Sequence, residues 1–323
     1  MNKKFYFFAL ASLLMLSANP VLAKDYYLAT GGSDANNGES AATALATLNA
    51  AVAKLAAGDV LHVSGMIPVS ETAAFAHLKA QAVTIKGEDK DMDGFDGQNS
   101  CRIINPNDSH VIFQNLTFQN GKLNVEDSQL GGGAIAANAS NIEVDNCYFM
   151  DNATLLTMGR GGAIGMTGGS LKVSNTLFSG NISRCGGAIY MNGSTKLELY
   201  SNQFIANQAL VGEEQIPDQN DATDGGALWI RSVGDITVQY CQFDSNMAHR
   251  AGGAVSFDSA LKNLKVEGCS FTNNWNGGYD ETFTVGKDGI NAAGRFGRGD
   301  GGAVSLYVGG VKDGAVLNFF SNT

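Results

Sequence analysis

The sequence predicts an all-β solenoid, in the form of a parallel β-helix, from two recurring motifs and from the alternation of side chains between them. The first motif is Gly-Gly-Ala followed by an aliphatic residue, and its first glycine stands at positions 132, 161, 186, 225, 252 and 301. The second motif is Phe-x-x-Asn. Its copies are Phe149/Asn152, Phe178/Asn181, Phe204/Asn207, Phe243/Asn246, Phe271/Asn274 and Phe319/Asn322.

The distance between the two motifs is almost constant. From the first glycine of each Gly-Gly-Ala to the next phenylalanine it is 17, 17, 18, 18, 19 and 18 residues, whereas the glycine-to-glycine interval varies from 25 to 49. The extra length therefore lies between each asparagine and the following Gly-Gly-Ala. This is typical of stacked coils, because each coil must keep its contacts with its neighbours while one corner can carry a longer loop.

Side chains between the motifs alternate with a period of two residues, which indicates β-strands. Seven residues before each of the first five phenylalanines begins an aliphatic, polar, aliphatic triplet. The central residues of these triplets are Glu143, Lys172, Glu198, Thr237 and Lys265. Coils that stack with parallel strands about 4.8 Å apart would make opposite charges neighbours on this outward row.

The motif residues themselves have structural explanations. Gly-Gly permits a tight corner with unusual dihedral angles, and the alanine fits the narrow angle behind it. The repeated asparagine is expected to adopt left-handed turn geometry and to hydrogen-bond to its counterparts along the axis. The position two residues before each phenylalanine is expected to face inward, and it holds small or medium side chains: Cys147, Thr176, Asn202, Cys241 and Cys269.

The two ends differ from the repeats. Residues 1–23 combine two early lysines, an apolar run and a small-residue cleavage site, so we expect a signal peptide and an exported protein. Residues 24–110 would form an N-terminal cap with the first coils, and residues 111–323 the repeats. In the last coil the segment from Lys312 to Asn318 lacks the usual aliphatic pair, so we expect a truncated chain, or a partner or further domain over this end.

A short helix is expected in the cap. Leu45, Leu48, Val52 and Leu55 fall at helical spacing, and Gly58 is placed to end the helix. Such a lid would cover the first coil, whose open strand edges would otherwise invite aggregation.

Composition narrows the classes of partner. The formal net charge is −10 and the sequence pI is about 4.8, which argues against nucleic acid, whose phosphates require clustered lysine and arginine. No apolar stretch after the signal peptide is long enough to span a bilayer. Five cysteines without the spacing of a small disulfide scaffold are expected to be mostly buried thiols.

The paired motifs resemble those of the chlamydial polymorphic membrane proteins and of similar repeat-bearing bacterial surface proteins. The resemblance covers about residues 111–323. The segment YYLATGGSDANNGES at residues 26–40 is similar to the start of many secreted bacterial β-helix proteins, including lyase-like ones. The resemblance implies the right-handed, single-stranded β-helix of the pectin-lyase-like superfamily, a place at the cell surface or outer membrane, and a role in adhesion to host cells.

Aromatic residues and long insertions supply the candidate binding residues. Tyr190 and Trp229 occupy the same outward position on adjacent coils and would form an exposed platform for sugar rings or a partner, unless the insertion from Gln208 to Asp224 covers them. The longest insertion, from Asn274 to Asp300, adds Trp275, Tyr279, Arg295 and Arg298. Arg298 opens an Arg-Gly-Asp tripeptide of the kind that integrins recognise, although so short a match arises readily by chance.

One segment resembles part of a calcium site. Asp89, Asp91 and Asp93 alternate and are followed by a glycine, as in the first half of a calcium loop. The twelfth position is Ser100 rather than glutamate. A Ca²⁺ ion and an ordinary turn both remain open for this segment.

These observations favour an exported adhesin-like binding protein that recognises a glycan or a host surface protein. One alternative is a polysaccharide lyase or glycoside hydrolase of the same fold, although the four histidines share no spacing and no catalytic motif is present. Another is a structural surface protein. A cleft lined by convergent carboxylates and one activated arginine or lysine would favour the enzyme, whereas a featureless face with long ordered loops would favour binding.

Overall fold

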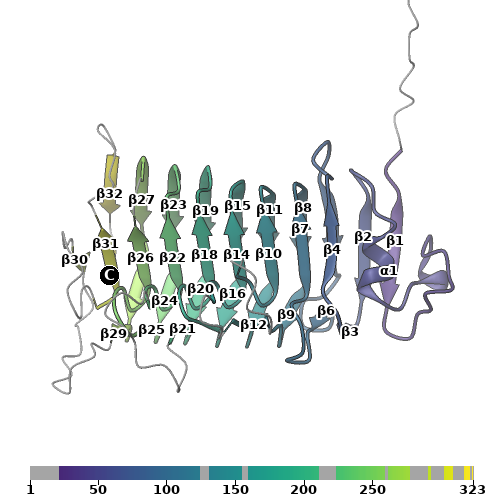
Figure 1. Cartoon of the computed structure of the whole chain (residues 1–323), viewed down its shortest axis with the longest axis horizontal. Helices are drawn as coiled ribbons and strands as arrows, with labels where there is room; N and C mark the ends of the chain where they lie inside the picture. Colours follow the sequence, from purple (N-terminus) through teal and green to yellow (C-terminus); the bar gives the residue numbers. More distant parts are fainter. Residues whose placement is uncertain are drawn as a thin grey trace, which may run out of the picture.

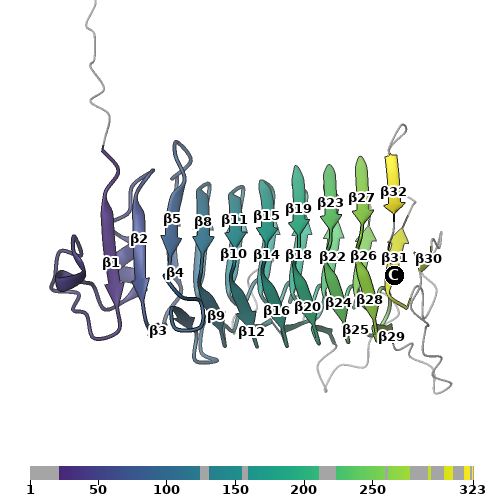
Figure 2. The ribbon, with the colours of Figure 1, turned by 180° about the vertical axis from the view of Figure 1, so that it is seen from behind.

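The computed structural model describes residues 22–123, 131–154, 159–210, 223–258, 261–276, 290–291, 302–307, 316–320 and 322. These residues form a right-handed parallel β-helix in which successive coils lie side by side along the long axis (Figures 1 and 2). The strands of each coil pair in parallel with those of the coils before and after. The predicted fold class is confirmed.

Four sheets run along the axis. Sheet A consists of β1 (Asp25–Ala29), β2 (Val60–Ser64), β5 (Val83–Lys86), β8 (His110–Gln114), β11 (Asn141–Asp145), β15 (Ser170–Ser174), β19 (Lys196–Tyr200), β23 (Asp235–Gln239), β27 (Asn263–Glu267) and β32 (Val316–Phe320). Sheet B consists of β3 (Met66–Pro68), β6 (Gly94–Asp96), β9 (Thr117–Gln119), β12 (Tyr148–Met150), β16 (Leu177–Ser179), β20 (Gln203–Ile205), β24 (Gln242–Asp244) and β28 (Ser270–Thr272).

The other two sheets complete each coil. Sheet C, whose central strands follow the Gly-Gly-Ala motifs, consists of β4 (Ala73–Ala76), β7 (Ile104–Asn107), β10 (Ile135–Asn138), β14 (Ile164–Thr167), β18 (Ile189–Asn192), β22 (Leu228–Arg231), β26 (Val255–Asp258), β31 (Val304–Tyr307) and β30 (Ile290–Asn291). Sheet D consists of β13 (Ala153–Thr154), β17 (Ile182–Ser183), β21 (Gln208–Ala209), β25 (Met247–Ala248) and β29 (Trp275–Asn276). A repeated coil therefore runs from sheet C through A and B to D.

The core is a stack of like residues. Phenylalanine rings of consecutive sheet B strands lie face to face, with centroids 4.8–4.9 Å apart and interplanar angles of 3–9°. The stacked rings are those of Phe118, Phe149, Phe178, Phe204, Phe243 and Phe271. The predicted inward row from Cys147 to Cys269 is also buried. The strand register deduced from the first five motif pairs is thus confirmed.

The Gly-Gly corner is confirmed as a backbone requirement. At Gly186, φ is +63°, in the left-handed region that favours glycine. At Gly187 the limit is space, because a Cβ atom would lie 2.5 Å from the backbone nitrogen of Gln208. The first glycine therefore sets the turn, and the second lets neighbouring chain segments approach.

The motif asparagines form a buried ladder, as predicted. Asn181 Nδ2 donates to Asn207 Oδ1 on the next coil at 2.9 Å and to the carbonyl oxygen of Phe149 at 3.0 Å. Asn181 Oδ1 accepts the backbone N–H of Asn152 at 3.1 Å. The prediction of left-handed geometry for these asparagines is wrong, because the residue just before each one has positive φ, as at Asp151 (54°) and Ala206 (53°). The asparagine amides are thereby turned inward.

The sixth motif pair is not equivalent to the others. β32 pairs with β27 so that Phe319 aligns with Val266 in sheet A. Asn322 Oδ1 accepts the backbone N–H of Cys269 at 2.9 Å, as Asn202 Oδ1 does for Thr176 at 3.0 Å. Phe319 with Asn322 is therefore a coincidental match. Leu317 and Phe319 align with the aliphatic residues Leu264 and Val266, so an aromatic residue stands at the second position of the pair in this coil.

The N-terminal cap contains a shorter helix than predicted. α1 (Leu48–Val52) begins after Thr47, whose hydroxyl accepts the backbone N–H of Ala50 at 3.2 Å, and a 3₁₀ turn, η1 (Ala41–Thr43), precedes it. The helix ends at Val52, well before Gly58, because the following residues form turns. In the described part of the chain, no helix is long and apolar enough to cross a membrane.

Candidate functional site

Tyr190 and Trp229 do lie next to each other, but they are not exposed. They align across β18 and β22 with ring centroids 5.1 Å apart. Their exposed fractions are only 1% and 3%. The prediction of an exposed platform is wrong because other groups cover the outer side of these rings. Cys185 packs against them and the guanidinium of Arg160 lies over both. Residues 211–222 of the insertion that was expected to cover them lie outside the described residues.

Of the other predicted binding residues, the structure describes Trp275 alone. Trp275 is half-buried in β29, where it aligns with Met247 of sheet D. Tyr279, Arg295 and Arg298 lie outside the described residues.

The predicted calcium segment forms a turn that uses its own carboxylate. Asp93 is buried, and its Oδ1 accepts the backbone N–H of Gly65 at 2.7 Å. Its Oδ2 accepts the backbone N–H groups of Glu88 at 2.8 Å and Asp89 at 3.0 Å. Among the described residues, Asp89, Asp91 and Asp93 make no group of three that could hold a metal ion. The geometry supports the turn, because both carboxylate oxygens of Asp93 already accept hydrogen bonds from backbone N–H groups.

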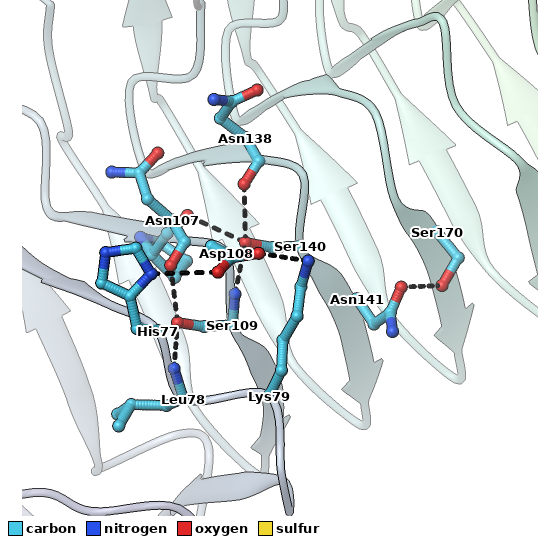
Figure 3. Close-up of polar contacts among 11 residues, drawn as sticks. His77, Leu78, Lys79, Asn107, Asp108, Ser109, Asn138, Ser140, Asn141 and Ser170 are labelled. Atoms are coloured by element: carbon cyan, nitrogen blue, oxygen red, sulfur yellow. Dashed lines mark hydrogen bonds and ion pairs between the residues drawn. The ribbon is translucent and has the colours of Figure 1, made fainter.

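A polar cluster joins sheets C and A at the corner of the early coils (Figure 3). The exposed His77 contacts Asp108 at 3.0 Å from Nδ1 to Oδ2, and Lys79 pairs with the same carboxylate. The Ser109 hydroxyl accepts the backbone N–H of Leu78 at 3.2 Å and donates to the carbonyl of Asn107 at 2.7 Å. Ser109 is fully buried, and its hydroxyl bonds to backbone groups, so it fastens the corner rather than presenting a nucleophile.

The outer face of sheet A is polar and largely ion-paired. Glu143 lies between His110 on one neighbouring coil, at 3.1 Å, and Lys172 on the other, at 3.5 Å. The predicted row runs in register from Glu143 through Lys172, Glu198 and Thr237 to Lys265. The predicted ladder of charges is confirmed.

Two exposed tyrosines stand at the edge of this face. The exposed fraction of Tyr200 is 51% and that of Tyr240 is 49%, and their rings meet edge to face with centroids 5.4 Å apart. Tyr200 ends β19, and Tyr240 follows β23 with φ of +55°. On the next coil, a Cβ atom on Gly268 would lie 2.6 Å from the Tyr240 ring, so the glycine makes room for it. The sequence pattern did not identify this pair. The available signal is that Tyr240 stands three residues before Phe243, whereas Gly268 stands three residues before Phe271 in the next coil.

A shallow hollow lies on the same face of sheet A. The hollow has a volume of about 240 Å³ over β23, β27 and β32, and its polar lining is Asp235, Thr237, Asn263, Lys265 and Asn318. Gln239 aligns with Tyr200 across the strands, and its amide donates to Glu267 at 2.5 Å. Hydrogen-bonding side chains thus continue from the hollow to the tyrosines.

Four carboxyl groups in the described residues have a lowered pKa, which favours their charged form. Wherever the pKa of a described carboxyl group departs from its ordinary value it is lowered, as for Asp34, Asp108, Asp244 and Glu267. Lys265 and then Gln239 lower the pKa of Glu267. Hydrogen bonds from Asn273 and Thr272 lower that of Asp244. A glycosidase requires one carboxyl group with a raised pKa as its general acid, which these four groups do not provide.

Burial of His249 predicts a loss of stability in mild acid. Burial lowers the pKa of His249 below its usual 6.5. As the pH falls through 6.5, His249 becomes protonated in the unfolded chain but stays neutral in the folded chain. The free energy of unfolding therefore falls until the pH reaches the lower pKa of the folded state. We expect urea unfolding at pH 8 and pH 5.5 to show a smaller pH-dependent loss for His249→Gln than for the wild type. An equal loss in both proteins would contradict this role.

Comparisons with known proteins place the chain in a family. The model of the right-handed β-helix region matches residues 95–291, which is more than half of the chain. A metabotropic glutamate receptor-like protein P from Dictyostelium discoideum is 29% identical over 252 residues, covering 62% of this chain but only 17% of that protein.

Two solved structures are similar at low sequence identity. A GH136 lacto-N-biosidase from Eubacterium ramulus has a TM-score of 0.38 and 12% identity, over 93% of this chain and 67% of that one. A rhamnogalacturonan lyase has a TM-score of 0.37 and 14% identity, over 92% of this chain and 87% of that one.

Proposed function

The chain belongs to the right-handed β-helix family, and we propose that it is an exported, adhesin-like protein that binds glycan on the outer face of sheet A. The observation that carries this proposal is the exposed pair of Tyr200 and Tyr240 on the same face as a polar hollow. The signal peptide expected at residues 1–23 and the resemblance to polymorphic membrane proteins support export and a surface role.

The chemistry of the face suits a sugar. A pyranose ring has an apolar face that packs on an aromatic ring and hydroxyl groups that need hydrogen-bonding partners. The tyrosines supply the aromatic surface, and polar groups such as Gln239 and Thr237 supply the hydrogen-bonding partners. The ring of Tyr240 packs over Gly268, and this contact reduces the side-chain freedom that would be lost on binding.

Binding is favoured over hydrolysis by the state of the carboxylates. On this face, Glu267 is held anionic by Lys265 and Gln239, and Asp235 accepts from the Asn263 amide at 2.6 Å. An anionic Glu267 has no proton to donate to a leaving group.

Substitution of the tyrosine pair tests the proposal. A panel of neutral and acidic oligosaccharides is first screened for binding and for release of new chain ends. We expect binding without cleavage, and Tyr200→Ala with Tyr240→Ala should weaken it about tenfold or more because the stacking surface is lost. Met92→Ala, which removes a side chain that is 67% exposed elsewhere, should bind as the wild type does. Undiminished binding by the double variant, or cleavage of any oligosaccharide, would overturn the proposal.

A further inference from the structure

Two cysteines occupy neighbouring places in the inward row that precedes sheet B. β24 and β28 pair in register from Gln242 with Ser270 onward, so Cys241 and Cys269, one residue earlier, are stacked on adjacent coils. Both are thiols in this structure, with exposed fractions of 0% and 1%. The row as a whole reads Cys147, Thr176, Asn202, Cys241 and Cys269, and these last two are its one pair of successive cysteines.

The two side chains interact directly. A hydrogen bond joins the Cys241 and Cys269 side chains, and the backbone of Cys241 also hydrogen-bonds to the Cys269 sulfur. Adjacent parallel strands lie about 4.8 Å apart, which falls within the separation of about 4.4–6.8 Å that a disulfide spans between Cα atoms. Stacking in register therefore brings these sulfurs within bonding reach without a rearrangement of either coil.

The acidity of Cys269 differs from that of an isolated buried thiol. The hydrogen bond with Cys241 lowers the pKa of Cys269, whereas burial raises the pKa of Cys241 well above its usual value. Cys147 provides the contrast, because its neighbours in the row are Leu116 and Thr176 and burial raises its pKa to about 12. The thiolate is the nucleophile in disulfide chemistry, so Cys269 is the sulfur suited to react first.

The position of the pair in the solenoid explains how an oxidant reaches it. Cys269 precedes β28, the last strand of sheet B in the described part of the chain. Each coil of a solenoid contacts only its neighbours, so an end coil can separate without unfolding the others. Both sulfurs are accessible before this coil packs on the preceding one. After packing, their burial protects a bond between them from reduction.

We propose that Cys241 and Cys269 form a disulfide that joins two successive coils. The oxidant is a low-molecular-weight disulfide such as oxidised glutathione. The Cys269 thiolate attacks one of its sulfurs, which breaks that S–S bond and releases one thiol. The Cys241 thiolate then attacks the Cys269 sulfur of the mixed disulfide and releases the second thiol. The two cysteines are oxidised, the added disulfide is reduced, and the two cysteine protons end on the two released thiols.

Refolding of the reduced full chain from urea, in a mixture of reduced and oxidised glutathione, tests the proposal. Circular dichroism confirms that the protein has refolded. Free thiols are then blocked with N-ethylmaleimide in denaturant before digestion with trypsin and mass spectrometry. Trypsin places Cys241 on residues 232–250 and Cys269 on residues 266–287. We expect these two peptides to be linked, at the sum of their masses less about two hydrogen atoms.

The other cysteines serve as internal controls for this measurement. Cys101, Cys147 and Cys185 fall on three further tryptic peptides and should carry the maleimide. Maleimide on both Cys241 and Cys269 in the refolded protein would overturn the proposal, as would a preferred link from either one to another cysteine. The reaction requires only the added oxidant, so its outcome is independent of export and of glycan binding.

Urea unfolding under oxidising and reducing conditions measures the effect of the bond. A disulfide closes a loop over residues 242–268 in the unfolded chain, so oxidation should lower the equilibrium constant of unfolding about a hundredfold. Cys241→Ser should abolish both the linked peptide and this difference, whereas Cys147→Ser, in the same row, should keep both. A wild-type stability that oxidation leaves unchanged, or an equal redox effect in folded Cys241→Ser, would contradict the proposal.

Discussion

Phe204→Ala is expected to lower the free energy of unfolding by about 3–5 kcal/mol. Phe204 is fully buried, and its ring lies between Phe178 at 4.8 Å and Phe243 at 4.9 Å. Truncation removes the apolar area of one ring and leaves a cavity that both neighbours line. They are held by their own coils and cannot close it.

Urea unfolding followed by circular dichroism measures this effect. Met92→Ala serves as the control, because its side chain is 67% exposed and should change stability by less than about 0.5 kcal/mol. A loss for Phe204→Ala as small as that of the control would be incompatible with a continuous ring stack.

Asn207→Ala is expected to cost at least about 3 kcal/mol, because it interrupts the ladder in both directions. The side chain accepts from the backbone N–H of Asn181 at 3.1 Å and from its amide at 2.9 Å. It donates to the carbonyl oxygen of Phe178 and to Asn246 Oδ1, both at 3.0 Å. Alanine would leave these buried groups without partners, and each unsatisfied group carries a penalty of about 1–3 kcal/mol.

Asn141→Ala is the matched control for the ladder. Asn141 is exposed on sheet A, where its side chain accepts from the Ser170 hydroxyl at 2.9 Å (Figure 3). We expect a change within about 0.5 kcal/mol by the same urea unfolding measurement. Equal costs for the two asparagines would show that burial of the ladder is not what stabilises the coils.

The repeated coils could be predicted because their determinants are local and recur. Phenylalanine at 149, 178, 204, 243 and 271 marks the same inward position in every coil, and the structure stacks all five. Phe118 joins the stack but escaped the motif, because Gly121 stands where the asparagine would be. The backbone N–H of Gly121 donates to Asn152 Oδ1, but glycine has no side chain that could continue the ladder, so the ladder ends there.

The candidate site was harder to predict because exposure depends on chain segments distant from the motif. Period two correctly placed Tyr190 and Trp229 outward from sheet C, yet Arg160 from an earlier coil lies over both rings. Tyr200 and Tyr240, in contrast, are exposed but were not identified from the sequence pattern. Tyr200 ends β19, whereas the exposure of Tyr240 follows from a corner whose geometry the neighbouring Gly268 permits, and a two-residue alternation carries no information about corners.

The uniform asparagine ladder has a consequence for how the chain folds. Because Asn181, Asn207 and Asn246 present nearly the same bonds to the coil on either side, a coil gains much the same energy from stacking on a wrong neighbour as on the right one. Correct order must then come from connectivity, since consecutive coils close the shortest loops and meet first. Folding that grows from one nucleus by adding the adjacent coil avoids skipped coils, whereas two nuclei started far apart would trap unpaired chain between them.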